Sequence, residues 1–469
     1  MSLRGICVLL GAGAASALQV AAPPIEAPWT IGSGSVSPST KLPKLFFAIK
    51  EQNGAEVEKI ALAASDPTSD SYGNHLSVDE LAALTAPAAA DVQKVRGWLA
   101  ASDCRVLSES TDRLLTVDCS VGAAEKLLAT TFRQLVHSAS GQRLLRAAEY
   151  TVPTELESAI SSVFGLHGMP LPPRARRATP LSPPKPWGAD VVAPPQRPAE
   201  PANVTPAVIA QVYNVEGVTV DRSSKNKMAV AEFQGQTMNE TDLQTYFDMF
   251  VPDAKPGDDS IDRFIGDPGN GASADEASLD IQFIMGVAPG IKTDFYLYNS
   301  MDFCKDLKNW TSHMLADPVT NPHPETQAVD AAAERVFAAG GCQDAALVHS
   351  VSYGIQANLT AEGKQMGCSK DNLDAVDADF AKLAARGLSI IFASGDSGSG
   401  YAPAFCEKGL QKDTQLTGTV SKAKCEGRPC PNETTSAADC CQISSAAKVR
   451  QPKSQHATHQ SPIRNSNTS

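Results

Sequence analysis

The sequence predicts an α/β protein of two folded parts, a small α+β unit followed by a larger unit built on a parallel sheet. In residues 28–166, short strand-like runs alternate with helical patterns. Residues 167–204 are rich in proline, which is typical of an extended, exposed linker. In residues 205–404, nearly continuous apolar runs alternate with amphipathic helices, as expected for strands covered on both faces. At 469 residues the chain is long enough for both domains.

The N-terminal unit is expected to form an antiparallel sheet with helices on one face. Its expected elements are a strand at 44–50, a helix at 55–64, a helix after Ser77, a helix at 88–101, a hairpin at 104–119 and a helix at 121–128. Ser77 and Glu80 have the spacing of a capping box. Cys104 and Cys119 flank two apolar runs joined by a polar turn, so we expect a disulfide between them.

The linker, residues 167–204, also contains the basic run Arg174–Arg177. Exposed linkers of this kind are preferred sites of proteolysis. In a secreted chain, a folded unit before such a linker indicates a propeptide that is cut away. The alternative is an ordinary spacer between two permanent domains.

The larger unit is expected to form a parallel sheet. Its expected strands are 228–233, 295–298, 346–353 and 388–392. Asn239 is expected to cap one helix, and another, at 373–385, to end in a left-handed cap at Gly387. Two polar runs, Ser352–Gly354 and Ser394–Gly398, follow strands. Ligands bind beyond the carboxyl ends of the strands in such sheets, so these runs are candidate site segments.

Glu276 and Asp280 form a pair of acids four residues apart. On a helix, this spacing places both carboxylates on one face. Two like charges held close together raise the pKa of one of them, which suits acid–base chemistry. An ordinary solvated pair on a helix surface is the alternative.

Met1–Ala17 has one basic residue, an apolar run and a small-residue end, the pattern of a secretory signal peptide. No later stretch reaches the roughly 18 apolar residues of a membrane span, so none is expected. The net charge of -12 disfavours nucleic acid and anionic membranes as partners and suits work in acid.

Ten of the eleven cysteines lie after the signal, which favours disulfides in an oxidising compartment. Four of them, Cys425, Cys430, Cys440 and Cys441, crowd the tail, where we expect disulfides rather than a zinc site. Six Asn-x-Ser/Thr sequons make glycosylation an expectation at some of Asn203, Asn239, Asn309, Asn358, Asn432 and Asn467.

Several motifs in one order resemble those of the sedolisins, or serine-carboxyl peptidases, and most of all the tripeptidyl-peptidase branch of that family. They are Ser65–Pro67, Tyr72–Ser77, Val204–Ile209, Tyr213–Asn214, Glu276–Asp280, Val351–Gly354 and Ala393–Gly398. The resemblance covers about residues 28–400. It implies a subtilisin-like peptidase domain preceded by a ferredoxin-like activation propeptide domain. It also implies an acid-acting zymogen whose partners are peptide or protein substrates and its own propeptide, in the secretory pathway, a lysosome or a vacuole, or outside the cell.

The resemblance assigns roles to individual residues. Glu276 is implied to be the general base, Asp280 the carboxylate that orients it and shares its proton, and Asp396 the oxyanion-hole donor. Asp396 would act in its protonated form, because a carboxylate has no hydrogen to donate. Ser352, Tyr353 and Gly354 are implied to bind the substrate backbone.

Two other enzyme interpretations fit less well, and one histidine is assigned no catalytic role. Ser397, in Gly395–Gly398, is better explained as a turn residue than as a chymotrypsin-type nucleophile, which needs a partnered histidine. His349 lies among apolar neighbours in an expected strand and is interpreted as a core histidine. A glycosidase pair needs carboxyl groups about 5 Å or more apart, farther than an i,i+4 pair provides.

The sequence departs from the family after Ala404. The family's Gly-Thr-Ser nucleophile motif and its aspartate-containing calcium site are both missing there, and Gly418–Ser421 is the nearest string. We therefore expect 205–404 to be a partial peptidase domain without nucleophile or calcium, and 405–469 a divergent tail without a core. The alternative is a non-catalytic paralogue that binds or inhibits an active peptidase through its propeptide domain.

Overall fold

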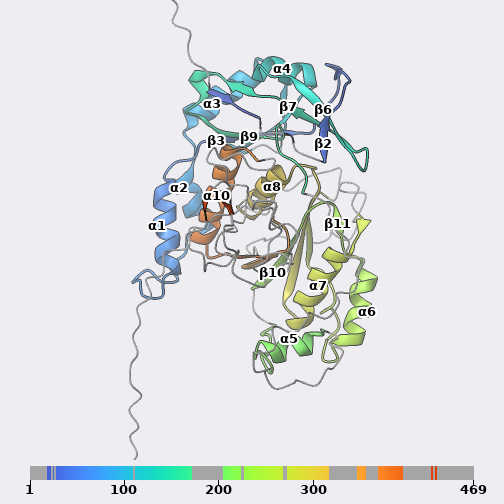
Figure 1. The fold of residues 1–469 in the computed structure, drawn as a ribbon. Helices are drawn as coiled ribbons and strands as arrows, with labels where there is room; N and C mark the ends of the chain where they lie inside the picture. The colour runs from blue at the N-terminus through green and yellow to red at the C-terminus, as the bar shows by residue number, and fades with distance from the viewer. Residues whose placement is uncertain are drawn as a thin grey trace, which may run out of the picture.

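The computed structural model describes residues 18–22, 25, 28–108, 111–171, 204–222, 226–267, 272–315, 346–354 and 368–393, together with the backbone of 424–425 and 428–429. The expected signal peptide, most of the proline-rich linker and nearly all of the tail lie outside the described residues. Within the described part, the chain forms two units that contact each other (Figure 1).

The N-terminal unit contains a four-stranded antiparallel sheet. Its strands, in spatial order, are β4 (Arg105–Val106), β5 (Leu114–Asp118), β3 (Leu45–Ile49) and β9 (Ile160–Phe164). Its helices are α1 (Gly54–Ser65), α2 (Val78–Thr85), α3 (Ala89–Ala100), α4 (Val121–Leu128) and the 3-10 turn η1 (Thr154–Leu156). Smaller sheets join β1 (Leu18–Val20) to β8 (Tyr150–Val152), and β2 (Trp29–Ile31) to β6 (Phe132–His137) and β7 (Arg143–Ala147).

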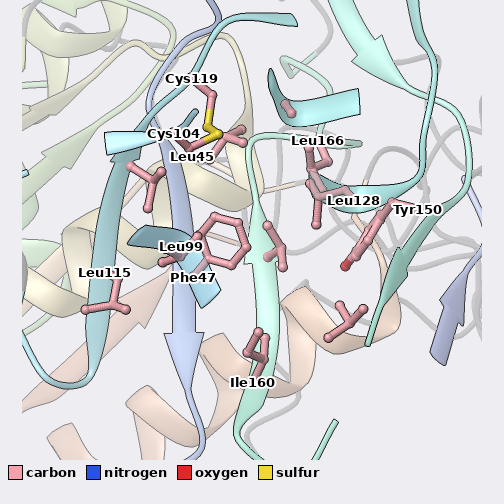
Figure 2. Packing of buried hydrophobic residues seen from close by; sticks show 14 of the residues in the cluster. Leu45, Phe47, Leu99, Cys104, Leu115, Cys119, Leu128, Tyr150, Ile160 and Leu166 are labelled. Carbon is pink, nitrogen blue, oxygen red and sulfur yellow. A yellow bond between two sulfur atoms is a disulfide. The ribbon is translucent and has the colours of Figure 1, made fainter. Parts of the chain in front are cut away.

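The core of this unit lies between one face of the sheet and helices α3 and α4. Figure 2 shows Phe47 of β3 beside Leu99 of α3, with Ile160 of β9 in the same cluster. Alternate residues of β3 face this core because side chains alternate across a strand. Burying each large apolar side chain contributes about 1.5–3 kcal/mol. The Cys104–Cys119 disulfide closes one end of the cluster, and this predicted pairing is confirmed.

The second unit contains a five-stranded parallel sheet, so the predicted fold class is confirmed. Its strands, in spatial order, are β12 (Arg263–Asp267), β14 (Lys292–Tyr298), β10 (Lys227–Glu232), β15 (Val348–Val351) and β16 (Ser389–Phe392). A short parallel pair, β11 (Gln236–Thr237) and β13 (Ala272–Ser273), lies near the end of β10. A two-stranded pair, β17 (Lys424–Cys425) and β18 (Arg428–Pro429), is described in the tail.

Helices cover both faces of this sheet. On one face lie α5 (Pro206–Val212), α6 (Glu240–Phe250) and α7 (Asp275–Val287); on the other lie α8 (Phe303–Leu315) and α10 (Lys370–Ala385). Local signals fix several helix ends. The Ser77–Glu80 capping box is present, Asn239 caps α6, and Gly387 has a φ of 83° after α10, all as predicted.

The second face of the N-terminal sheet packs against α8 and α10, which Figure 1 shows directly below β3 and β9. Phe46 of β3 and Phe164 of β9 share a core cluster with Trp310 of α8 and Phe380 of α10. Leu171, which the sequence assigned to the linker, belongs to the same cluster, and His167, also assigned to the linker, is buried. We call this contact surface the seam.

Hydrogen bonds reinforce the seam. Asn372 Nδ2 donates to Ser162 Oγ at 2.6 Å and to the Val163 carbonyl at 3.0 Å. Leu76 N donates to the Ala385 carbonyl at 2.8 Å, so the connection before α2 is tied to the end of α10. Within the second unit, a disulfide that the sequence did not predict joins Cys304 of α8 to Cys368, next to α10. It links the two helices that form this side of the seam.

Candidate functional site

Helix α7 positions the acid pair at the carboxyl edge of the parallel sheet. Ala277, Ile281 and Met285 are buried against β10 and β14, because they recur every four residues on the face turned to the sheet. Ala274 N donates to the Thr237 carbonyl at 3.0 Å and fixes the start of the helix. Glu276 is part of the first turn and lies half-buried at that end of the sheet.

Asp280 follows one turn later on α7 and is also half-buried. The helix that the sequence required for this pair is therefore present, with both acids four residues apart along it. Such a pair presents its carboxyl groups on one side of the helix.

Glu232 is a third carboxyl group at this site, and sequence reasoning missed it. It is the last residue of β10 and its side chain is fully buried. Burial raises the pKa of Glu232 well above its usual range, and the negative charges of Asp280 and Glu276 raise it further. A contact with the Tyr353 hydroxyl acts in the opposite direction. The raised pKa favours the neutral, protonated form of Glu232 beside the acid pair, which is the form that can donate a hydrogen bond.

The sequence did contain a signal for Glu232. An acid that ends an otherwise apolar strand lies at the carboxyl edge of a parallel sheet, where ligands bind. A buried acid there costs free energy unless neighbouring groups satisfy it, which makes such a position unusual.

The carboxyl end of β15 lies beside that of β10. The two strands pair in parallel, with Ala231 opposite Val351, and Ala393 N donates to the Val351 carbonyl at 2.9 Å. The predicted substrate-binding run Ser352–Gly354 therefore leaves the sheet at the same edge as Glu232. Within it, the Tyr353 ring is buried edge-on against Phe233 at 5.5 Å, so its side chain belongs to the core. Gly354 is exposed.

Of the other residues considered in the sequence analysis, Asp396 cannot be placed in the structure and His349 can. Asp396 and the neighbouring Ser397 lie outside the described residues. His349 is fully buried between the rings of Tyr296 and Trp310, and burial lowers its pKa to about 4. Its Nε2 lies 2.9 Å from the Ala346 carbonyl, an arrangement that suits a neutral core imidazole.

No group of three or more histidine, cysteine or acidic side chains able to hold a metal occurs in the part of the chain that the structure describes. The region after Ala404, where the family resemblance implies a calcium site, lies outside the described residues except for the backbone of 424–425 and 428–429. No helix in the described ranges is long and apolar enough to cross a membrane.

The N-terminal unit matches a known protein family. Residues 30–169 match the family described as "Pro-kumamolisin, activation domain". The N-terminal unit is similar to this domain over most of its length, and we call it the activation domain below. This domain ends at the seam, where Gly168 lies against Asp302 at the start of α8.

Over most of its length, the chain is similar to tripeptidyl-peptidase 1 from several mammals. It is 29% identical to the rat protein over 382 residues, 28% to the mouse protein over 380 and 29% to the dog protein over 380. Each alignment covers 80% of this chain and 59% of the relative. The chain thus spans about three-fifths of the length of these relatives, and the predicted resemblance to the sedolisins is confirmed.

Proposed function

We propose that this chain is the zymogen form of an acid-acting serine-type peptidase of the sedolisin type. The observation that carries the proposal is the meeting of Glu232, Glu276 and Asp280 at one edge of a parallel sheet, in a chain that begins with an activation domain. Paired carboxyl groups that share protons are suited to acid–base catalysis at low pH.

The geometry suggests a division of roles. Glu276, at the start of α7, accepts the proton of the attacking hydroxyl. Asp280 holds the proton of Glu276 in position, and neutral Glu232 in turn supports Asp280 by donating to it. Asp396, in its protonated form, donates a hydrogen bond to the oxyanion. The substrate backbone lies along Ser352–Gly354. No Gly-Thr-Ser run follows Asp396 in the sequence, so the nucleophile has no assigned residue.

The presence of the activation domain supports the proposal that the chain is a zymogen. It packs on α8 and α10, on the sheet face opposite α7, so it is held by a surface distinct from the acid pair. Its connection to the peptidase unit passes through the basic, proline-rich segment 172–203, where cleavage would separate the two. We place the protein in the secretory pathway, in a lysosome or vacuole, or outside the cell, where acid is available.

The experiment compares three forms of the full chain after incubation at about pH 4, an acidity at which one carboxyl of a coupled pair keeps its proton. Peptides with free and with blocked amino termini separate tripeptide removal from internal cleavage. We expect Glu276→Gln to lower the rate by at least about 100-fold, the usual contribution of a general base. Asp275→Asn, an exposed neighbour in the same turn, should retain activity.

A fluorophosphonate label followed by peptide mapping would identify the serine that acts. Cleavage that Glu276→Gln leaves unchanged, or a complete lack of cleavage by the unaltered chain, would overturn the proposal for this chain.

A second candidate function is binding to an active peptidase through the activation domain. The seam favours it, because a surface that packs on two helices of one peptidase unit can pack on the equivalent helices of another. In that case the unaltered chain slows a related peptidase at micromolar concentration without cleaving peptides itself.

A further inference from the structure

We propose that Asn239 carries an N-linked oligosaccharide and that Asn309 remains unmodified in the folded protein. Both residues open a sequon, and they are the two sequon asparagines within the described residues. The inference rests on the secretory location proposed above, but not on peptidase activity.

Asn239 is exposed at the first turn of α6. Its Oδ1 accepts from Thr241 N at 2.8 Å and from Asp242 N at 3.3 Å, so the side chain is held by its oxygen. The nitrogen Nδ2, which would bear the sugar, takes no part in these cap bonds. Attachment at Nδ2 therefore keeps the cap, which contributes about 1 kcal/mol to the helix.

The chemistry is a group transfer from a lipid-pyrophosphate-linked oligosaccharide. A bond forms between Nδ2 of Asn239 and the first sugar carbon, while the bond from that carbon to the pyrophosphate oxygen breaks. The lipid pyrophosphate leaves with the electron pair, and Nδ2 loses one proton. No oxidant or reductant is required.

Asn309 lies in a very different environment, midway along α8. The next two residues of its sequon, Trp310 and Thr311, are fully buried. Thr311 Oγ1 contacts Asp379 Oδ2 at 2.6 Å, and Lys308 Nζ donates to the same oxygen at 2.7 Å. This side of α8 is packed against α10.

Asn309 itself lines a cavity of about 1150 Å³ at the seam. Phe46 of β3 and Leu114 of β5, both from the activation domain, line the same cavity. A branched oligosaccharide on Asn309 would have to occupy the space between α8 and the activation-domain sheet. It would hold the two units apart, so chains that fold with a closed seam carry no sugar there.

The test uses the full chain from residue 18 onwards behind a secretion signal of a eukaryotic host, so that entry does not depend on residues 1–17. Enzymatic release of N-glycans in heavy-oxygen water converts each modified asparagine to labelled aspartate, which peptide mapping then locates. We expect the label at Asn239 and none at Asn309. Thr241→Ala should abolish the label at Asn239, and Thr241→Ser should keep it, since both variants retain the backbone N–H that the cap uses.

An unlabelled Asn239, or a labelled Asn309 in secreted folded protein, would overturn the inference. A parallel expression with the native residues 1–17 tests the location separately. If that form stays inside the cell while the host-signal form is secreted with sugar on Asn239, the proposed location fails and the inference stands.

Discussion

Glu51 of the activation domain and Lys382 of α10 form an ion pair across the seam, with 2.5 Å between Oε2 and Nζ. The Lys382 side chain is 7% exposed and also lies 2.7 Å from Asp379 Oδ1. Arg113, from the activation domain, contacts the other Glu51 oxygen at 3.0 Å. The pair therefore joins a chain of charges that crosses from one unit to the other. The activation domain is held by charge as well as by apolar packing.

Glu51→Gln should weaken the seam by about 1.5–3 kcal/mol, the usual contribution of a hydrogen bond to a charged group. The variant leaves Lys382 with Asp379 alone and removes the charge that faces it across the seam. The expected result is faster release of the activation domain when the linker is cut by an added protease, measured by size-exclusion chromatography.

The matched control is Glu56→Gln, which breaks the exposed pair with Lys59 on α1. Exposed pairs contribute little, so this variant should change release by less than about 0.5 kcal/mol. Equal effects of the two variants would show that the Glu51 pair does not hold the seam.

We expect His167 to make the stability of the protein depend on pH. It is buried beside Arg146, its ring lies 5.2 Å from that of Tyr150, and its Nε2 lies 2.5 Å from the Ala148 carbonyl. Burial lowers the pKa of His167 from its usual 6.5, and the charge of Arg146 lowers it further, while the Ala148 contact and Asp302 raise it. Below pH 6.5 the unfolded chain binds a proton that the folded chain resists. The free energy of unfolding therefore falls as the pH falls below 6.5 through the lowered pKa.

Replacement of His167 by glutamine should remove this part of the pH dependence, because glutamine can still donate to Ala148 and does not titrate. Urea unfolding between pH 8 and pH 5 measures it: the loss of stability on acidification should be smaller in the variant than in the unaltered chain. His75→Gln, at an exposed histidine of the same domain, serves as the control. If the two variants lose stability in parallel with the unaltered chain, His167 is not the group responsible.

Local signals in the sequence predicted much of the fold and about half of the site. The cap at Asn239, the capping box at Ser77 and the Cys104–Cys119 hairpin depend on residues close together in the chain, so they could be read directly. The helix carrying Glu276 and Asp280 is of the same kind.

The remaining features depend on contacts between distant residues. Glu232 meets the acid pair only because β10 ends where α7 begins. Cys304 and Cys368 are 64 residues apart, and their pairing follows from the packing of α8 on α10. No sequence period marks the seam, because β3 is buried on both faces and its pattern is uniformly apolar.

Glu232→Gln should test the neutral state of the buried acid. Since the folded pKa is raised above the unfolded value, the stability contributed by protonated Glu232 is complete below pH 4.5 and is lost as the pH rises through the folded pKa. Glutamine stays neutral throughout. We expect the variant and the unaltered chain to have similar urea midpoints at pH 4, and the variant to be the more stable at pH 8.

Glu216→Gln is the control for this comparison, because Glu216 is exposed on the loop after α5. It should shift the midpoint equally little at both pH values. A Glu232→Gln variant that is less stable than the unaltered chain at pH 8 would mean that Glu232 is charged in the folded protein.

Gly387 has a backbone conformation that favours glycine, and it lies against His75 at the seam. Its φ of 83° is in the left-handed region, which costs an ordinary residue about 1–2 kcal/mol. A Cβ at this position would lie 2.8 Å from the ring of His75 in the activation domain. Gly387→Ala should therefore destabilise the protein by at least about 1 kcal/mol, measured by urea unfolding. Gly97→Ala, at an exposed position of α3 where a Cβ meets nothing within 4 Å, should instead stabilise it by about 0.5–1 kcal/mol. If both variants changed the stability in the same direction, the left-handed cap would not be what the position requires.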